Sequence, residues 1–105
     1  MTRRAEQVED KDISERDNFR FDFSRALVTG ETVSSAVVTC EVASGTDASP
    51  SALLSGSPTV SSPNVTQLVI GGTLGVSYYI RCVATLSSGR VLASTALVNI
   101  IRLSA

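Results

Sequence analysis

Apolar and polar residues alternate most clearly between Leu68 and Ile101, where the pattern predicts a strand, a glycine turn, a strand, a four-residue turn and a final strand. Because strand side chains point to opposite faces in turn, one alternate set is expected to line a core. That set is Tyr78, Ile80, Cys82, Ala84 and Leu86. The intervening set, which includes Tyr79, is expected to be partly solvated. Ser87–Arg90 predicts the hairpin turn and Val91–Ile101 the returning strand.

Earlier parts of the chain show the same periodicity in shorter runs. All three phenylalanines, Phe19, Phe21 and Phe23, fall on one face of a predicted first strand and should anchor it in the core. Val33–Val42 and Val65–Ile70 predict two further strands. Two weaker candidates are a short strand at Ser51–Leu54 and a brief edge pairing at Thr59–Val60, between prolines that cannot donate to a ladder.

No run of ten residues combines helical spacing with capping signals. About six or seven short strands separated by turn residues predict an all-β sandwich or barrel. A chain of 105 residues is long enough for one such domain with one core.

The first 17 residues are almost entirely polar and show no strand or helix period. We therefore expect residues 1–17 to form an extended arm and residues 18–105 to form the domain. The arm is either a frayed terminus or a segment that docks on a neighbouring subunit. Candidate pairing residues in the second case are Arg3, Arg4, Glu6, Asp10 and Lys11.

Charge is distributed unevenly, because thirteen of the nineteen charged residues lie within the first 25 positions. The net charge of −1 argues against nucleic acid or an anionic membrane as a partner. The sparsely charged body indicates either a surface covered by other subunits or a Ser/Thr-rich domain kept soluble by hydroxyls. No apolar run approaches the roughly 20 residues that span a bilayer, and no secretory signal is visible, so the protein is expected in a cytosol until its assembly leaves the cell.

Few residues are suited to catalysis or metal binding. There is no histidine, which removes the commonest general base and metal ligand. Cys40 and Cys82 could form the inter-sheet disulfide of an immunoglobulin-type domain, but a reducing compartment favours two buried free thiols. The Gly71–Gly75 run lacks the lysine and helix of a phosphate loop and predicts a turn. We expect no enzymatic activity, no cofactor and no metal site.

Two stretches together resemble a family of small immunoglobulin-like structural proteins of tailed bacteriophages. The first is Phe21-Asp22-Phe23 with Leu27 and Gly30; the second is Gly71, Gly72, Thr73, Gly75 and Tyr78, followed by Ser88-Gly89-Arg90. The resemblance covers roughly Phe19 to Ile101. It implies an immunoglobulin-like β-sandwich of about seven strands, located in the virion, assembled in the host bacterial cytoplasm and without enzymatic activity.

The function expected from this resemblance is that of a capsid decoration or cement protein. It would stabilise the head by binding the major capsid protein or other virion proteins, in many copies or as a homo-oligomer. Tyr79, on the outer face of its strand, is a further candidate contact. One alternative is a tail, baseplate or fibre subunit. Another is a host-surface or carbohydrate-binding module, which should expose aromatic side chains.

Overall fold

Strands β6 (Ser77–Leu86) and β7 (Val91–Ile101) form the central hairpin of the larger of two sheets in the computed structural model, which describes residues 7–102. The alternation predicted along β6 is confirmed. The buried set is Tyr78, Ile80, Cys82, Ala84 and Leu86. The predicted turn at Ser87–Arg90 joins the two strands, so the hairpin pattern in the sequence specified its own register.

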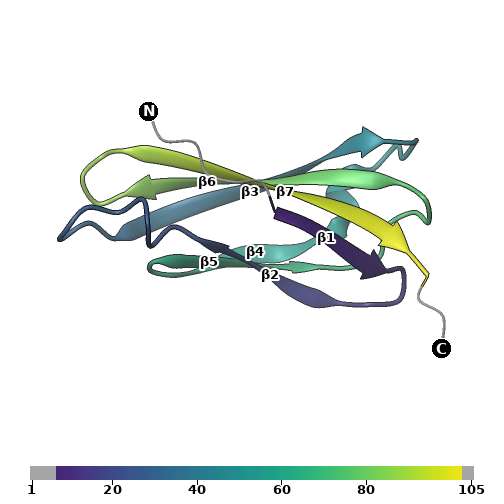
Figure 1. Cartoon of the computed structure of the whole chain (residues 1–105), viewed down its shortest axis with the longest axis horizontal. Helices are drawn as coiled ribbons and strands as arrows, with labels where there is room; N and C mark the ends of the chain where they lie inside the picture. The colour runs from purple at the N-terminus through teal and green to yellow at the C-terminus, as the bar shows by residue number, and fades with distance from the viewer. Residues whose placement is uncertain (1–6, 103–105) are drawn as a thin grey trace.

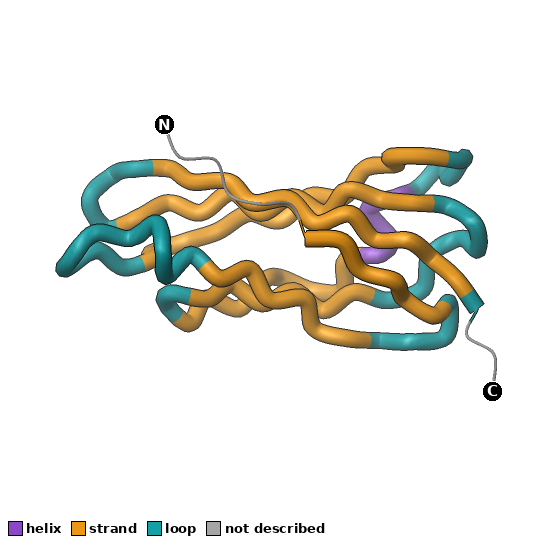
Figure 2. Tube along the Cα trace, viewed as in Figure 1, coloured by secondary structure: helices purple, strands orange, loops and turns teal. Residues whose placement is uncertain are grey.

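Two sheets pack face to face as the layers of a sandwich (Figures 1 and 2). The larger sheet has the order β1-β7-β6-β3, with β1 at Gln7–Asp12 and β3 at Val33–Ser44. The smaller has the order β2-β5-β4, with β2 at Asp17–Asp22, β5 at Asn64–Val69 and β4 at Leu54–Ser61. If β2 to β7 are lettered B to G, the sheets read B-E-D and C-F-G, which is the immunoglobulin arrangement. The predicted all-β, immunoglobulin-like sandwich is confirmed.

Strand β1 differs most from the sequence-based prediction. In place of the arm expected over residues 1–17, residues 7–12 pair in parallel with β7, from Gln7 opposite Ala96 to Asp12 opposite Ile101. Residues 1–6 lie outside the described residues. The backbone ladder supplies the hydrogen bonds of β1, and the edge position leaves Glu9 and Asp10 in contact with water. A strand of this kind needs no apolar alternation in its sequence.

The core lies between the two sheets and contains the predicted aromatic anchor. Phe21 and Phe23 are fully buried and Phe19 nearly so, as the period-2 pattern predicts. The same core contains buried apolar side chains from the other strands and from the 3-10 turn, among them Leu53, Val65, Val69, Ile80, Val98 and Ile100. Each buried aromatic ring removes a large apolar area from water, so these contacts supply much of the stability of the fold.

The segment between β3 and β5 was predicted less well. Pro50–Leu53 forms a 3-10 turn, where a short strand was expected over Ser51–Leu54. Strand β4 then covers all of Leu54–Ser61, although only Thr59–Val60 was expected to pair. Pro58 is tolerated because β4 is an edge strand, and the register against β5 breaks between Ser55 and Thr59.

Cys40 and Cys82 lie on adjacent strands of one sheet, β3 and β6, and both are free. Two buried free thiols were predicted, and the thiols are free, but only Cys82 is fully buried while Cys40 is half-buried. Their placement in one sheet also shows why an inter-sheet bridge is impossible, since Cys40 is on the third strand of the immunoglobulin order and not the second. Burial raises the pKa of Cys40 to about 12 and that of Cys82 to about 11, so both thiols stay protonated at neutral pH.

Candidate partner-binding site

Three connections meet at the end of the sandwich opposite the C-terminus (Figure 1): residues 23–32, 62–63 and 87–90. Backbone and side-chain hydrogen bonds join them in pairs. The N–H of Phe23 donates to the carbonyl of Pro63 at 3.0 Å, and the N–H of Val33 donates to Ser62 Oγ at 3.0 Å. The N–H of Ser87 donates to the carbonyl of Thr32 at 2.8 Å. We call these three connections the loop end.

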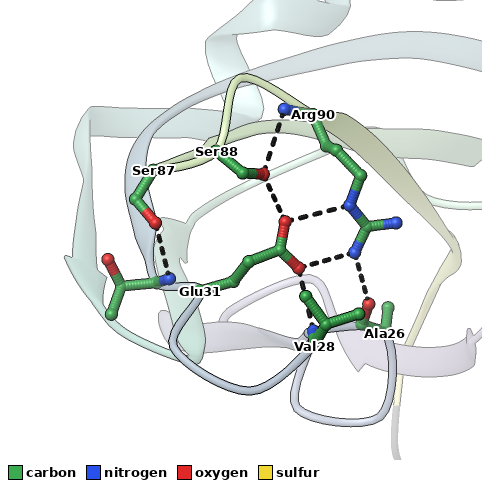
Figure 3. A network of polar contacts seen from close by, with 7 residues as sticks. Ala26, Val28, Glu31, Ser87, Ser88 and Arg90 are labelled. Atoms are coloured by element: carbon green, nitrogen blue, oxygen red, sulfur yellow. Dashed lines mark hydrogen bonds and ion pairs between the residues drawn. The ribbon is translucent and has the colours of Figure 1, made fainter.

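An ion pair between Glu31 and Arg90 crosses the loop end (Figure 3). Arg90 Nη2 donates to Glu31 Oε1 at 2.7 Å and Arg90 Nε donates to Oε2 at 3.0 Å, which is the bidentate geometry that arginine makes with carboxylates. Ser88 Oγ also donates to Glu31 Oε2, and the N–H of Val28 donates to Oε1 at 2.8 Å. Arg90 Nη2 reaches the carbonyl of Ala26 at 2.8 Å. One carboxylate and one guanidinium therefore hold the two longer connections together.

These contacts change the titration of the pair. Hydrogen bonds from Arg90, then from Ser88 and the Val28 N–H, lower the pKa of Glu31 from 4.5 to about 2. The hydrogen bonds to Glu31 raise the pKa of Arg90. Both groups stay ionised at neutral pH, so the contact between the two connections keeps its opposite charges there.

The sequence predicts a turn at Arg90 but not its pairing with Glu31. A signal was present, because Glu31 and Arg90 are two of only six charged residues after position 25 and have opposite charges. Around the pair the exposed residues of the loop end are mostly polar, among them Ser24, Arg25 and Thr29. Two valines are also exposed, Val28 at 61% and Val91, at the start of β7, at 59%. A surface that combines an ion pair, hydroxyl groups and exposed valines is suited to binding another protein.

The opposite end contains a second polar network, centred on the buried Tyr78. Its hydroxyl donates to Asp47 Oδ2 at 2.6 Å and accepts the N–H of Thr73 at 3.0 Å. Immunoglobulin domains place a tyrosine at the start of strand F in the same way, with its hydroxyl bound to backbone just upstream. The contact forms here although Tyr78 precedes Cys82 by four residues and not two. Desolvation and the bond to Asp47 raise the pKa of Tyr78, and the same bond lowers that of Asp47.

The structure does not bring the predicted contact residues into one site. Arg3, Arg4 and Glu6 lie outside the described residues. Asp10 is exposed on β1 and accepts a bond from Asn99 Nδ2 at 3.1 Å. Tyr79 lies half-buried on the outer face of the larger sheet, opposite Leu97 of β7.

Lys11 requires a correction, because its ammonium group is not available to a partner. The residue is only 2% exposed, and Nζ donates to the carbonyls of Gly71 at 2.8 Å and Asp12 at 3.0 Å. Burial lowers its pKa, against the opposing effect of Glu15 and Asp12. The parallel pairing of β1 turns this side chain inward, which the sequence of an apparently free arm could not reveal.

Within residues 7–102 no three His, Cys, Asp or Glu side chains gather in a way that could hold a metal ion. The same residues contain no helix with the length and apolar character needed to cross a membrane.

The fold is an immunoglobulin-like β-sandwich domain, and the loop end is its candidate contact surface. A family model described as "Podophage GP4 fiber-tail adaptor protein gp77" matches residues 11–99. The chain belongs to this family and is a component of a tailed-phage virion, assembled in the host cell. A search of curated proteins found no match.

This finding corrects the functional prediction. The resemblance to a virion protein of tailed phages is confirmed, but the family is described as a tail adaptor and not as a capsid decoration or cement protein. The major capsid protein is accordingly not supported as a partner. The alternative of a tail, baseplate or fibre subunit agrees better with the family.

Proposed function

We propose that this protein is an adaptor that joins the tail of a podophage virion to its fibres, by binding alone and without catalysing a reaction. The observation that carries the proposal is the family match, which extends over residues 11–99 and so includes most of the sandwich. The absence of histidine from the sequence agrees with a role in binding and not in acid–base catalysis.

The shape of the domain supports a bridging role. Its principal extents are 45 × 28 × 26 Å, so the two ends of the sandwich are well separated along the longest axis. An adaptor must contact two partners without one blocking the other. We assign one contact to the loop end, where the Glu31–Arg90 pair fixes the connections and Val28 and Val91 are exposed.

Pre-organisation gives this surface a physical advantage. A loop that is ordered before binding loses less conformational entropy when the partner docks, so more of the contact energy appears as affinity. Burial of exposed valines adds a hydrophobic contribution, and many copies on one particle increase the effective concentration of each contact.

The carbohydrate-binding alternative receives no comparable support. It requires aromatic side chains on an exposed face, but Phe19, Phe21, Phe23 and Tyr78 are buried and Tyr79 is only half-exposed.

Imaging of virions tests the proposal. Particles assembled with a tagged copy of this chain should carry the label at the tail, and particles assembled without the chain should have normal heads but lack fibres. Label spread over the whole shell, or normal fibre attachment in particles without the chain, would contradict it.

A further inference from the structure

The four edge strands of the described sandwich are not equally protected against pairing with another chain. Strand β1 has six residues, four of them charged, and turns Lys11 inward. Strand β2 also has six residues and includes Asp17, Arg20 and Asp22. Strand β4 contains Gly56 and Pro58 and a break in its register. Short length, charge, proline and irregularity are the features by which natural sheets prevent edge-to-edge association.

Strand β3 largely lacks these features. It has twelve residues, VSSAVVTCEVAS, without proline, glycine, lysine or arginine, and its one charged residue is Glu41. Irregularities between Val33 and Ser35 and between Val42 and Ser44 leave a regular stretch of eight residues, 35–42. β3 is the last strand of its sheet and makes no ladder with β4, which lies beside it in the other sheet.

The inner face of β3 is apolar, and its mostly polar outer face carries one exposed apolar residue, Val37. Val37, on the outer face, is 63% exposed. The residues that face inward are only partly covered, whereas the corresponding residues of β6 are buried. The half-buried set on β3 is Ala36, Val38, Cys40 and Val42. The edge therefore combines unpaired backbone groups with incompletely buried apolar area.

We propose that β3 pairs in an antiparallel manner with β3 of a second copy of this chain, across a two-fold axis, to join the two larger sheets into one. Two identical strands of equal length can satisfy each other's backbone hydrogen bonds. In the joined sheet, inner-face residues must lie opposite inner-face residues, so the residue numbers of each opposing pair must sum to an even number. Centring the axis on Val38 places Glu41 opposite Ser35, and centring it on Thr39 places Glu41 opposite Val37. Neither register brings two like charges into contact.

This pairing is independent of the proposed tail–fibre role, since it rests on the edges of the sheets and not on the family. Sedimentation velocity of the full chain tests it. The chain should form a reversible dimer, and the amides of residues 35–42 should exchange hydrogen more slowly in the dimer than in the monomer.

Matched variants identify the surface. In either register, Val37→Glu brings the new carboxylate of one copy beside Glu41 of the other copy. The repulsion between these like charges should raise the dissociation constant of the dimer by about tenfold or more. Val8→Glu is the control, because Val8 is also 63% exposed but lies on β1, at the opposite edge of the same sheet. It should leave the dissociation constant unchanged. If Val37→Glu does not fold, Thr39→Glu on the same face tests the same contact.

Three results would overturn the proposal. The first is a monomer at concentrations up to about 1 mM. The second is a dimer that Val37→Glu and Thr39→Glu leave intact. The third is an equal loss of association in Val8→Glu, which would place the contact on another surface.

Discussion

Glu31 and Arg90 are 59 positions apart in the sequence, yet Arg90 Nη2 lies 2.7 Å from Glu31 Oε1. The connection between β2 and β3 supplies the carboxylate, and the turn between β6 and β7 supplies the guanidinium. The two strands that bring them together, β3 and β6, are neighbours in the larger sheet. The ion pair thus depends on a long-range strand pairing, and it joins the connection between the two sheets to the turn of the β6–β7 hairpin.

The stability of the domain should fall in acid, and Glu31 should contribute to the fall. Its pKa is about 2 in the folded chain against an ordinary value of 4.5, so the folded state binds fewer protons. The contribution is complete above pH 4.5 and is lost as the pH falls toward 2. Urea unfolding between pH 7 and pH 3 measures it. Glu31→Gln should be less stable at pH 7 and lose less stability on acidification. Some dependence of stability on pH should remain in this variant, because the pKa values of Asp47 and Asp22 are also lowered. An unchanged slope in Glu31→Gln would contradict this.

Removing the hydroxyl of Tyr78 should destabilise the domain at the end opposite the loop end. Tyr78→Phe leaves the Thr73 N–H and the Asp47 carboxylate without their shared partner, which costs about 1–2 kcal/mol of the free energy of unfolding. Tyr79→Phe is the control, since Tyr79 is half-exposed on the outer face and should change stability little. Chemical denaturation of both variants gives the comparison, and equal stabilities would be inconsistent with a structural role for the hydroxyl.

Gly72→Ala should be more destabilising than Gly89→Ala. Both glycines have positive φ, +101° and +94°, so both variants carry backbone strain. A Cβ at Gly72 would also lie 2.7 Å from Ile100 Cγ1 and 2.8 Å from Cδ1, whereas a Cβ at Gly89 meets nothing within 4 Å. The difference in the free energy of unfolding should be about 1–3 kcal/mol, the usual cost of overpacking a core. Similar values for the two variants would show that Ile100 moves aside freely.

A carboxylate in place of either exposed valine of the loop end should weaken attachment to a virion partner. Val28→Asp and Val91→Asp should reduce binding to tail or fibre proteins by tenfold or more in a pull-down titration, since burying an unpaired charge costs well over about 1.4 kcal/mol. Leu74→Asp is the matched control, because Leu74 is 46% exposed in the connection between β5 and β6 at the other end. Loss of binding in all three variants would show that the effect is not specific to the loop end.

The strands with strong alternation were predictable because their two faces meet different environments. Phe19, Phe21 and Phe23 mark an inward face, and Tyr78 to Leu86 mark another, so burial alone assigns their orientation. Strand β1 and most of β4 were not predictable in this way. Most described side chains of these two strands are exposed or only partly covered, so no alternate set of buried apolar residues marks an inward face.

The residues of the candidate site are visible in the sequence, but their contact is not. The sequence places Ser88 and Arg90 in a turn, whereas the bidentate contact with Glu31 depends on which connections share an end of the sandwich. Lys11 is the reverse case. Its charge indicated a solvated or partner-bound group, whereas parallel pairing with β7 buries it against the carbonyl of Gly71.

From its sequence alone this chain is an all-β domain with one aromatic-anchored core, sparse charge after its first 25 residues and a pattern related to phage virion proteins. The first three properties follow from alternation and composition, which depend only on residues close together in the sequence, and the last follows from resemblance to a known family. The tertiary structure decided which strands are neighbours, that Cys40 and Cys82 share a sheet, that β1 joins β7 and that Glu31 meets Arg90. Such contacts join residues distant in sequence, and they form only when the packing of two whole sheets has selected one arrangement of strands.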